Sequence, residues 1–195
     1  MKDLLWEQQQ IVDYRDFGFD LYGFRHDFDN MVPLKRKVLE IGCGNGYFLQ
    51  RLEKIGFSDV VGIDVVDDAI KDSKSRTTFP VMKMNGHVTD FDDSTFDAIV
   101  ASHVIEHSPF PKVMIREMKR IAKPDGLLFI EIPIEKVASP GGGHFSIWKE
   151  KKEFSDMLLS EKLVIIRDYM GYNSVDSREV EGKENHYVVV CKVIK

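Results

Sequence analysis

Residues 38–49 read Val-Leu-Glu-Ile-Gly-Cys-Gly-Asn-Gly-Tyr-Phe-Leu. The first four residues predict a short buried strand, the glycines at 42, 44 and 46 predict a loop, and the apolar residues after them begin an amphipathic helix. Glycine lets the backbone turn sharply and approach a ligand closely. A strand that passes through such a loop into a helix is typical of an α/β sheet that binds its ligand at the carboxyl end of the strand.

The spacing of these glycines decides between two classes of ligand. In the dinucleotide fingerprint GxGxxG the third glycine would fall at position 47, which is Tyr47, whereas this loop reads GxGxG behind Glu40. A pyrophosphate favours the full glycine turn and a helix N-terminus, but Glu40 would repel an anion and attract the sulfonium and ammonium groups of S-adenosylmethionine. Asp64 follows Gly46 by 18 residues, at the end of the next predicted strand, where a carboxylate can accept hydrogen bonds from both ribose hydroxyls.

Short apolar runs alternate with amphipathic segments along the chain, which predicts a mostly parallel sheet with helices on both faces. The predicted strands are Lys37–Ile41, Val60–Ile63, Val81–Met84, Ala98–Ala101, Leu127–Ile132, Val164–Asp168 and Tyr187–Val193. The predicted helices are Leu4–Tyr14, Gly46–Ile55, Asp67–Ser73, Lys112–Ala122 and Lys149–Leu159. The connection between the last two strands has no helical pattern, so these strands are expected to pair antiparallel at one sheet edge.

The composition fits one folded domain over residues 1–195, with a cap segment at 1–30 and an insert loop at 133–148. Hydrophobic residues make up 43% of the chain, which excludes a disordered or low-complexity protein. The net charge of -5 disfavours nonspecific electrostatic binding to nucleic acid or to an anionic membrane. Cys43 and Cys191 lie far apart without CxxC spacing, so we expect reduced thiols in a cytoplasmic protein without a membrane span.

Taken in order, these motifs resemble the class I S-adenosylmethionine-dependent methyltransferases from about residue 35 to residue 195. Thr95–Val100, Ser102–His107 and Met114–Ile130 resemble that family's fourth strand, post-strand segment, and helix, turn and fifth strand. The resemblance implies a doubly wound α/β fold whose seven-stranded sheet has an antiparallel last strand. It also places the glycine loop at the methionine portion of the cofactor, Asp64 at the ribose, and the segment after strand three at the adenine. The residues expected to contact S-adenosylmethionine, or its product S-adenosylhomocysteine, are Glu40, Gly42, Cys43, Gly44, Gly46, Asp64, Val65, Asn85, His87 and Ser102.

The segment after the third strand departs from the family pattern of an acidic residue followed by a small one. Two alternatives stand at this point, Asn85 before Gly86 or His87 before Val88. The amide oxygen of Asn85 can accept a hydrogen bond from the adenine amino group. His87 can stack on the ring or be a solvated loop residue.

Four histidines fall in or beside loops at the carboxyl edge of the predicted sheet: His87, His103, His107 and His144. Methyl transfer to a hydroxyl or amine needs a positioned nucleophile, exclusion of water and removal of a proton. His107 is the first candidate for the general base. The alternative is a structural role, because a histidine at this point can shape the pocket or begin the next helix.

His103, Glu106, His107 and His144 form a second hypothesis, in which the four side chains collect one divalent cation. The pattern is similar to the ExxEH motif of quinone-ring O-methyltransferases and small-RNA terminal 2′-O-methyltransferases. His103 stands where those groups have Glu, which replaces an anionic ligand with a neutral one. The primary prediction therefore includes no metal, and these four residues are candidates for catalysis.

The sequence thus predicts an S-adenosylmethionine-dependent methyltransferase that acts on oxygen or nitrogen of a small-molecule acceptor, as a monomer or homodimer. A metal-dependent RNA 2′-O-methyltransferase-like enzyme and a cofactor-binding module without catalysis are the alternatives. Nucleic acid is disfavoured, because the basic clusters are limited to residues 35–37 and 149–152. The acceptor pocket is expected to form from residues 133–148 and from the N-terminal aromatic residues, including Tyr14, Phe17, Tyr22 and Phe24, unless these pack as core.

Overall fold

The computed structural model describes residues 24–134, 143–171 and 186–195. The described helices are α2 (Arg25–Met31), α3 (Tyr47–Ile55), α4 (Asp67–Arg76), α5 (Pro111–Ile121), α6 (Lys151–Ser160) and the 3-10 helix η2 (Ile105–His107). The described strands are β1 (Val38–Ile41), β2 (Val60–Asp64), β3 (Val81–Lys83), β4 (Phe96–Ser102), β5 (Ala122–Pro133), β6 (Leu163–Gly171) and β7 (His186–Val193). The predicted helix Leu4–Tyr14 lies outside the described residues. Within these ranges, no helix combines the length and apolar character that crossing a membrane requires.

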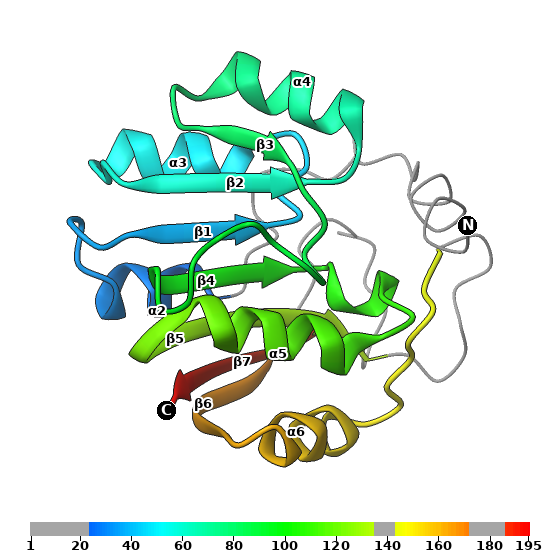
Figure 1. The fold of residues 1–195 in the computed structure, drawn as a ribbon. Coiled ribbons are helices and arrows are strands. Elements are labelled where there is room, and N and C mark those ends of the chain that lie inside the picture. Colours follow the sequence, from blue (N-terminus) through cyan, green and yellow to red (C-terminus); the bar gives the residue numbers. More distant parts are fainter. Residues whose placement is uncertain (1–23, 135–142, 172–185) are drawn as a thin grey trace.

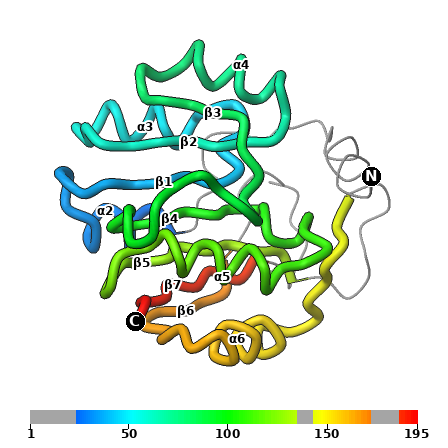
Figure 2. Tube along the Cα trace, in the orientation of Figure 1, coloured from blue at the N-terminus to red at the C-terminus, as the bar shows by residue number. Residues whose placement is uncertain are grey.

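The seven strands form one sheet in the order β3-β2-β1-β4-β5-β7-β6. β1 pairs parallel with β2 and β4, and β4 pairs parallel with β5. β7 is antiparallel to both β5 and β6, which confirms the predicted hairpin at the sheet edge. Figure 1 shows the result: β7 runs against the other strands, and the carboxyl ends of β1, β2 and β4 meet at one edge. The tube in Figure 2 shows the chain leaving β1, β2 and β4 at that same edge.

Helices cover both faces of the sheet, as the apolar strands predicted. On one face, α5 and α6 pack against inward-pointing residues such as Ile99 and Ile130. On the other face, α2, α3 and α4 cover residues such as Val100 and Phe129. Neighbouring positions on one strand therefore belong to different cores, because side chains alternate between the faces of a sheet. Both faces are covered, which explains why the central strands lack a polar face.

Helix α2 lies inside the aromatic segment that the sequence analysis left without a helix. Phe24 and Phe28 are fully buried, and the Phe28 ring lies 5.3 Å from the Phe48 ring and 5.0 Å from the Phe129 ring. Of the two alternatives for Phe24, acceptor pocket or core, the structure shows core packing, with its ring 5.8 Å from the Phe48 ring. The spacing of Phe24, Phe28 and Val32 by four residues is the helical signal that was missed.

The other elements lie within a few residues of their predicted positions, and the largest difference is at β5. This strand begins at Ala122 instead of Leu127, because Ala122 pairs with Phe96 ahead of a turn in which Asp125 takes a positive φ of 62°. β4 is likewise longer than predicted and begins at Phe96. The central apolar runs are therefore the part of each strand that the sequence identified.

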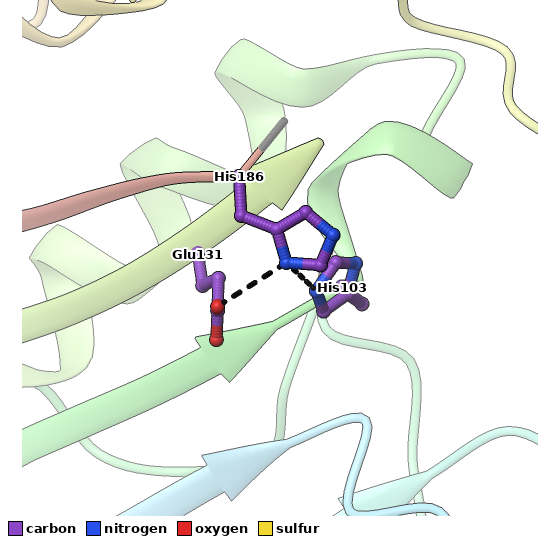
Figure 3. Close-up of side chains that lie close together, drawn as sticks. All are labelled: His103, Glu131 and His186. Atoms are coloured by element: carbon purple, nitrogen blue, oxygen red, sulfur yellow. Dashed lines mark hydrogen bonds and ion pairs between the residues drawn. The ribbon is translucent and has the colours of Figure 1, made fainter. Parts of the chain in front are cut away.

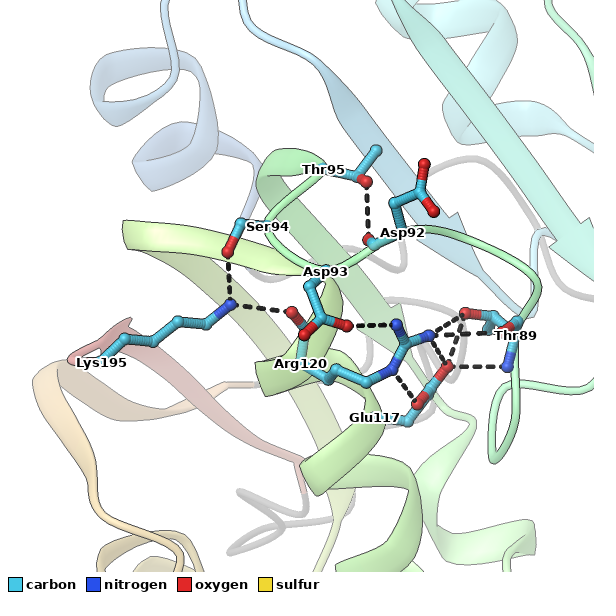
Figure 4. Close-up of polar contacts among 8 residues, drawn as sticks. All are labelled: Thr89, Asp92, Asp93, Ser94, Thr95, Glu117, Arg120 and Lys195. Atoms are coloured by element: carbon cyan, nitrogen blue, oxygen red, sulfur yellow. Dashed lines mark hydrogen bonds and ion pairs between the residues drawn. The ribbon is translucent and has the colours of Figure 1, made fainter.

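A polar network on α5 holds the loop between β3 and β4 (Figure 4). Glu117 accepts two hydrogen bonds from the Arg120 guanidinium, at 2.9 and 2.7 Å, and one from the backbone N–H of Thr89 at 2.7 Å. Arg120 also donates to Asp93 at 2.6 Å. Burial raises the pKa of Glu117, but the hydrogen bonds from Arg120 and Thr89 outweigh it and leave the pKa below its usual value. The ionised Glu117 side chain therefore fixes the loop that carries Asn85 and His87.

We predict that Glu117→Gln lowers the free energy of unfolding by about 1.5–3 kcal/mol at pH 7, the range for a hydrogen bond to a charged group. A folded-state pKa below the unfolded value stabilises the fold at pH values above the unfolded pKa. This contribution is lost as the pH falls through the folded pKa, so the difference between the two proteins shrinks in acid. Denaturant unfolding of the unmodified protein and of Glu117→Gln, at pH 7 and near pH 3, measures this difference in free energy of unfolding. An equal difference at both pH values would show that ionised Glu117 does not stabilise the fold.

Candidate active site

The glycine loop after β1 is held against the end of β2 by its own backbone. The N–H groups of Gly42 and Cys43 both donate to the carbonyl of Ile63, at 2.8 and 3.0 Å. Gly42, Gly44 and Gly46 have φ values of 69°, 50° and 80°, a left-handed conformation that favours glycine. The loop therefore turns tightly at the carboxyl edge of the sheet, as the glycine spacing predicted.

The three glycines are required for different reasons. A Cβ at Gly42 would lie 2.3 Å from Val104 Cγ2, and a Cβ at Gly46 would lie 2.4 Å from Ser73 Oγ and 2.8 Å from the Ser73 Cα. A Cβ at Gly44 would meet no atom within 4 Å. Packing within the chain thus explains the first and third glycines. Gly44 faces open space in which a ligand can approach the backbone.

Asp64, at the end of β2, lies directly beside this opening. Its Oδ2 accepts a hydrogen bond from the Gly44 N–H at 2.9 Å, and its Oδ1 accepts one from the Val66 N–H at 2.9 Å. Burial raises the pKa of Asp64 and outweighs these hydrogen bonds and the one from the Val65 backbone, which lower it. Two residues that the sequence assigned to one ligand, Gly44 and Asp64, are therefore in contact.

Glu40 brings a second carboxylate to the loop. It is the third of the four buried residues of β1 and is 1% exposed. The pKa of the buried Cys43 thiol is raised by burial and then by the charges of Glu40 and Asp64. Cys43 is therefore a protonated thiol with no nucleophilic role. The two carboxylates give the loop a negative potential that favours a cationic ligand.

The loop after β3 joins the two residues that the sequence left as alternatives. Asn85 Oδ1 accepts a hydrogen bond from the His87 backbone N–H at 2.9 Å and lies 2.7 Å from His87 Nδ1. His87 Nε2 lies 2.6 Å from the Ser108 hydroxyl. His87 is thus a fixed link between two loops and not a freely solvated residue. A contact of either residue with adenine stays a prediction.

Helix η2 places His107 beside the segment that follows β5. The backbone N–H groups of Phe145 and Ser146 donate to the carbonyl of Glu106, at 2.9 and 3.0 Å. This pairing sets the His144 ring at 4.9 Å from the His107 ring, with an interplanar angle of 77°. Two histidines that lie 37 positions apart in sequence are therefore brought together, as the metal hypothesis required.

The protonation of His107 follows from its contacts. Its Nδ1 lies 3.3 Å from the carbonyl oxygen of Gly143, which can only accept, so the proton lies on Nδ1 and the lone pair on Nε2. Burial is the main reason that the pKa of His107 lies below its usual value, and it outweighs the opposing charge of Glu106. The imidazole is therefore neutral near pH 7 and able to accept a proton.

Glu106 is 1% exposed and contacts His103, with 3.2 Å between its Oε1 and His103 Nδ1. Burial raises the pKa of Glu106, but the hydrogen bond from His103 and the charges of His103 and His107 outweigh it, so the net shift is downward. In the described part of the chain, nothing hydrogen-bonds to its Oε2. Glu106, His107 and His144 each offer a ligand atom within 4.8 Å of the other two.

His103, the fourth residue of the metal hypothesis, lies in a different group of side chains. His103 Nε2 lies 3.2 Å from His186 Nδ1, at the start of β7, and that nitrogen lies 3.5 Å from Glu131 Oε1 on β5. Ser102 donates to the other oxygen of Glu131 at 2.9 Å. The four residues of the metal hypothesis therefore do not form one group of converging ligand atoms, and two groups of three stand in its place among the described residues. A charged residue inside the apolar run 127–132 was the available signal for Glu131, whereas nothing local marked His186.

The predicted acceptor pocket lies mostly outside the described residues. Tyr14, Phe17 and Tyr22 lie outside them, and so does the part of the insert loop at 135–142. Trp148, at the end of that loop, is buried and packs its ring 4.8 Å from the Phe154 ring. The described part of the loop therefore joins the core at Trp148 and reaches the site at His144.

Comparisons with known proteins agree with this geometry. Residues 39–130 match a family model described as a methyltransferase domain. The mitochondrial ubiquinone biosynthesis O-methyltransferase of Bos taurus is 37% identical over 103 residues, which are 48% of this chain and 28% of that protein. This chain covers less than half the length of that relative and of the other ubiquinone biosynthesis O-methyltransferases it matches.

Solved structures confirm the fold. A methyltransferase in complex with the Haloferax volcanii activator Trm112 has a TM-score of 0.76 at 13% identity, over 97% of this chain and 98% of that one. The [4+2]-cyclase SpnF has a TM-score of 0.68 at 14% identity, over 82% of this chain and 75% of that one. Because a cyclase shares the fold, the reaction has to be argued from the site.

We predict that Gly44→Ala removes binding of S-adenosylhomocysteine at a stability cost of about 1–2 kcal/mol, the cost of a non-glycine residue in the left-handed conformation that Gly44 adopts. The added methyl group meets no atom of the chain and instead occupies the open space at the loop. The matched control is Gly46→Ala, whose Cβ collides with Ser73 and which should lower the melting temperature markedly. Calorimetric titration and thermal unfolding of both variants measure this contrast. Full binding by folded Gly44→Ala protein would show that the loop does not touch the ligand.

We predict that Asp64→Ala weakens S-adenosylhomocysteine binding by about 1.5–3 kcal/mol, the usual cost of losing hydrogen bonds to a charged group. Asp64→Asn keeps the shape of the side chain and one acceptor oxygen, so it tests whether the charge and the second acceptor matter. Dissociation constants of both variants, compared with that of the unmodified protein, provide the measurement. An unchanged constant in both would rule out Asp64 as a ribose ligand.

Proposed function

We propose that this chain is a class I S-adenosylmethionine-dependent methyltransferase, which transfers a methyl group from S-adenosylmethionine to an oxygen of a small-molecule acceptor. Oxygen is preferred over nitrogen because relatives that are 37% and 34% identical over about half of this chain are named as O-methyltransferases. A small acceptor agrees with those relatives, which are named for ubiquinone biosynthesis. The observation that carries the proposal is the opening at Gly44, where Asp64 accepts the Gly44 N–H and Glu40 lies in the strand that leads into the loop.

The residues present fit such a cofactor. The position that an added Cβ would fill at Gly44 leaves room for a ligand to touch the backbone. Asp64 lies at that opening with its carboxylate held by two backbone N–H groups, and the remaining lone pairs of both oxygens can accept hydrogen bonds from hydroxyls. Glu40 adds negative charge under the loop, where an ammonium or sulfonium group would be attracted. Neither carboxylate suits a pyrophosphate.

When bound, S-adenosylmethionine supplies an activated methyl group, and its transfer breaks a carbon–sulfur bond as a carbon–oxygen bond forms. The chain's own task is to hold the acceptor hydroxyl in line, exclude water and take up the hydroxyl proton. His107 suits the last step, because it is neutral and directs the Nε2 lone pair away from the Gly143 carbonyl. The Gly143 carbonyl holds the ring in this tautomer, as expected for an oriented base.

The reaction is tested with the purified protein, S-adenosylmethionine and a panel of small hydroxylated aromatic compounds, with small amines as the comparison set. Formation of S-adenosylhomocysteine that depends on a hydroxylated acceptor, together with methylated product in the mass spectrum, would support the proposal. Methylation of amines alone would contradict the choice of oxygen and would show that nitrogen is the atom methylated. Binding of S-adenosylhomocysteine without turnover on any acceptor would favour a cofactor-binding module.

We predict that His107→Asn lowers turnover on the best acceptor by about 100-fold or more while the affinity for S-adenosylhomocysteine stays unchanged. If His107 acts as the base, exhaustive chelation has no effect, and His144→Asn is much milder. If Glu106, His107 and His144 bind a divalent cation, chelation abolishes activity, added metal restores it, and His144→Asn is as harmful as His107→Asn. Near-normal turnover of His107→Asn would exclude both roles and leave catalysis by positioning alone.

A further inference from the structure

Three metal-ligating side chains converge from three strands, apart from the glycine loop (Figure 3). His103 follows β4, Glu131 lies near the end of β5, and His186 begins β7. His103 Nε2 and His186 Nδ1 lie 3.2 Å apart, and His186 Nδ1 lies 3.5 Å from Glu131 Oε1. All three ligand atoms lie within 4.8 Å of one another. No motif read from the sequence joined these residues.

We propose that His103, Glu131 and His186 form a binding site for a divalent transition-metal ion. Zinc bonds to histidine nitrogen and carboxylate oxygen are about 2.0–2.2 Å long, so neighbouring ligand atoms of a tetrahedral ion lie about 3.3 Å apart. The distances of 3.2 and 3.5 Å between adjacent ligand atoms match this spacing. The three donors therefore already approach the arrangement that one ion would impose.

The hydrogen bonds around the site prepare its ligand atoms. Glu106 Oε1, at 3.2 Å from His103 Nδ1, is an acceptor, so it draws the His103 proton to Nδ1 and leaves the Nε2 lone pair facing the site. Ser102 donates to Glu131 Oε2 and leaves Oε1 toward His186. Outer carboxylates and hydroxyls that orient ligands in this way are typical of metal sites.

A divalent cation would also be compatible with the charges of this cluster. A cation among the three atoms accepts electron density from all of them at once. It also offsets the negative charge of Glu131, whose side chain is 2% exposed.

The donor set indicates the class of ion. Two imidazoles and one carboxylate suit Zn²⁺, Fe²⁺ or Co²⁺, whereas Mg²⁺ and Ca²⁺ favour sites made only of oxygen ligands. The His103 side chain is 30% exposed, while those of His186 and Glu131 are nearly fully buried, so an ion would enter from the side of His103. Three protein ligands leave a coordination position for water or a bound molecule.

The test uses Co²⁺ as the probe, because its visible absorption reports its ligands. The protein is freed of metal with a chelator and titrated with CoCl₂, and bound metal is counted by elemental analysis. We expect His186→Asn to lower the amount of bound Co²⁺ by one equivalent and to remove the bands of that site. Glu131→Gln should do the same, and Ser102→Ala should weaken binding by about 10–100-fold.

Two control variants separate this site from the other histidines. His144→Asn alters the neighbouring group of Glu106, His107 and His144, and His26→Asn alters a side chain that is 87% exposed. Both should keep the Co²⁺ bands of the His103 site. Thermal unfolding and S-adenosylhomocysteine binding verify that each variant folds, and neither measurement needs methyl transfer.

Two results would overturn the proposal. One is the absence of stoichiometric Co²⁺ or Zn²⁺ binding by the unmodified protein, which would leave the cluster as a hydrogen-bonded network. The other is unchanged Co²⁺ uptake and spectrum in folded His186→Asn or Glu131→Gln protein. If one of these variants fails to fold, the other decides. If both fail, X-ray absorption of Co²⁺-loaded His144→Asn protein, with the His103 site intact, counts the nitrogen ligands of the ion. Two histidine nitrogens would support the proposal, and fewer than two would contradict it.

Discussion

The parallel pairing of β1 with β2 on one side and β4 on the other is the constraint from which the site follows. This pairing brings the loops after three strands to one edge of the sheet, with the glycine loop in the centre. The Ile63 carbonyl then holds the loop through two backbone N–H groups, and the Gly44 N–H meets Asp64. A ligand at Gly44 therefore lies beside the segments that carry His87 and His107, although those residues are distant in sequence.

The fold and the glycine loop were predictable because their signals are local. Glycine spacing, an acidic residue at a strand end and uniformly apolar runs all follow from the backbone and from burial of neighbouring residues. The grouping of the histidines was not predictable in this way. His103 and His186 are 83 positions apart, and they meet only because β7 inserts between β5 and β6. His103 also adopts a positive φ of 53°, which its sequence context did not indicate.

Charge distribution explains why one edge of the sheet is chemically active. Glu40, Glu106 and Glu131 are each at most 2% exposed, and buried carboxylates destabilise a fold unless partners compensate them. Histidines compensate two of them, through His103 at Glu106 and His186 at Glu131. Glu40 lies at the glycine loop, where its charge raises the pKa of the Cys43 thiol. The same fold also occurs in a cyclase, so these side chains carry the specificity that the fold leaves open.

Burial of both cysteines has a practical consequence. Burial raises the pKa of both thiols, and the charges of Glu40 and Asp64 raise that of Cys43 further, so neither reacts readily with an alkylating reagent in the folded state. Cys43 lies within the glycine loop, whereas Cys191 lies in the centre of the β7 pairing. Labelling kinetics at the two thiols would therefore report two different openings, local release of the loop and separation of the sheet. The chain carries its own pair of probes for the order in which it unfolds.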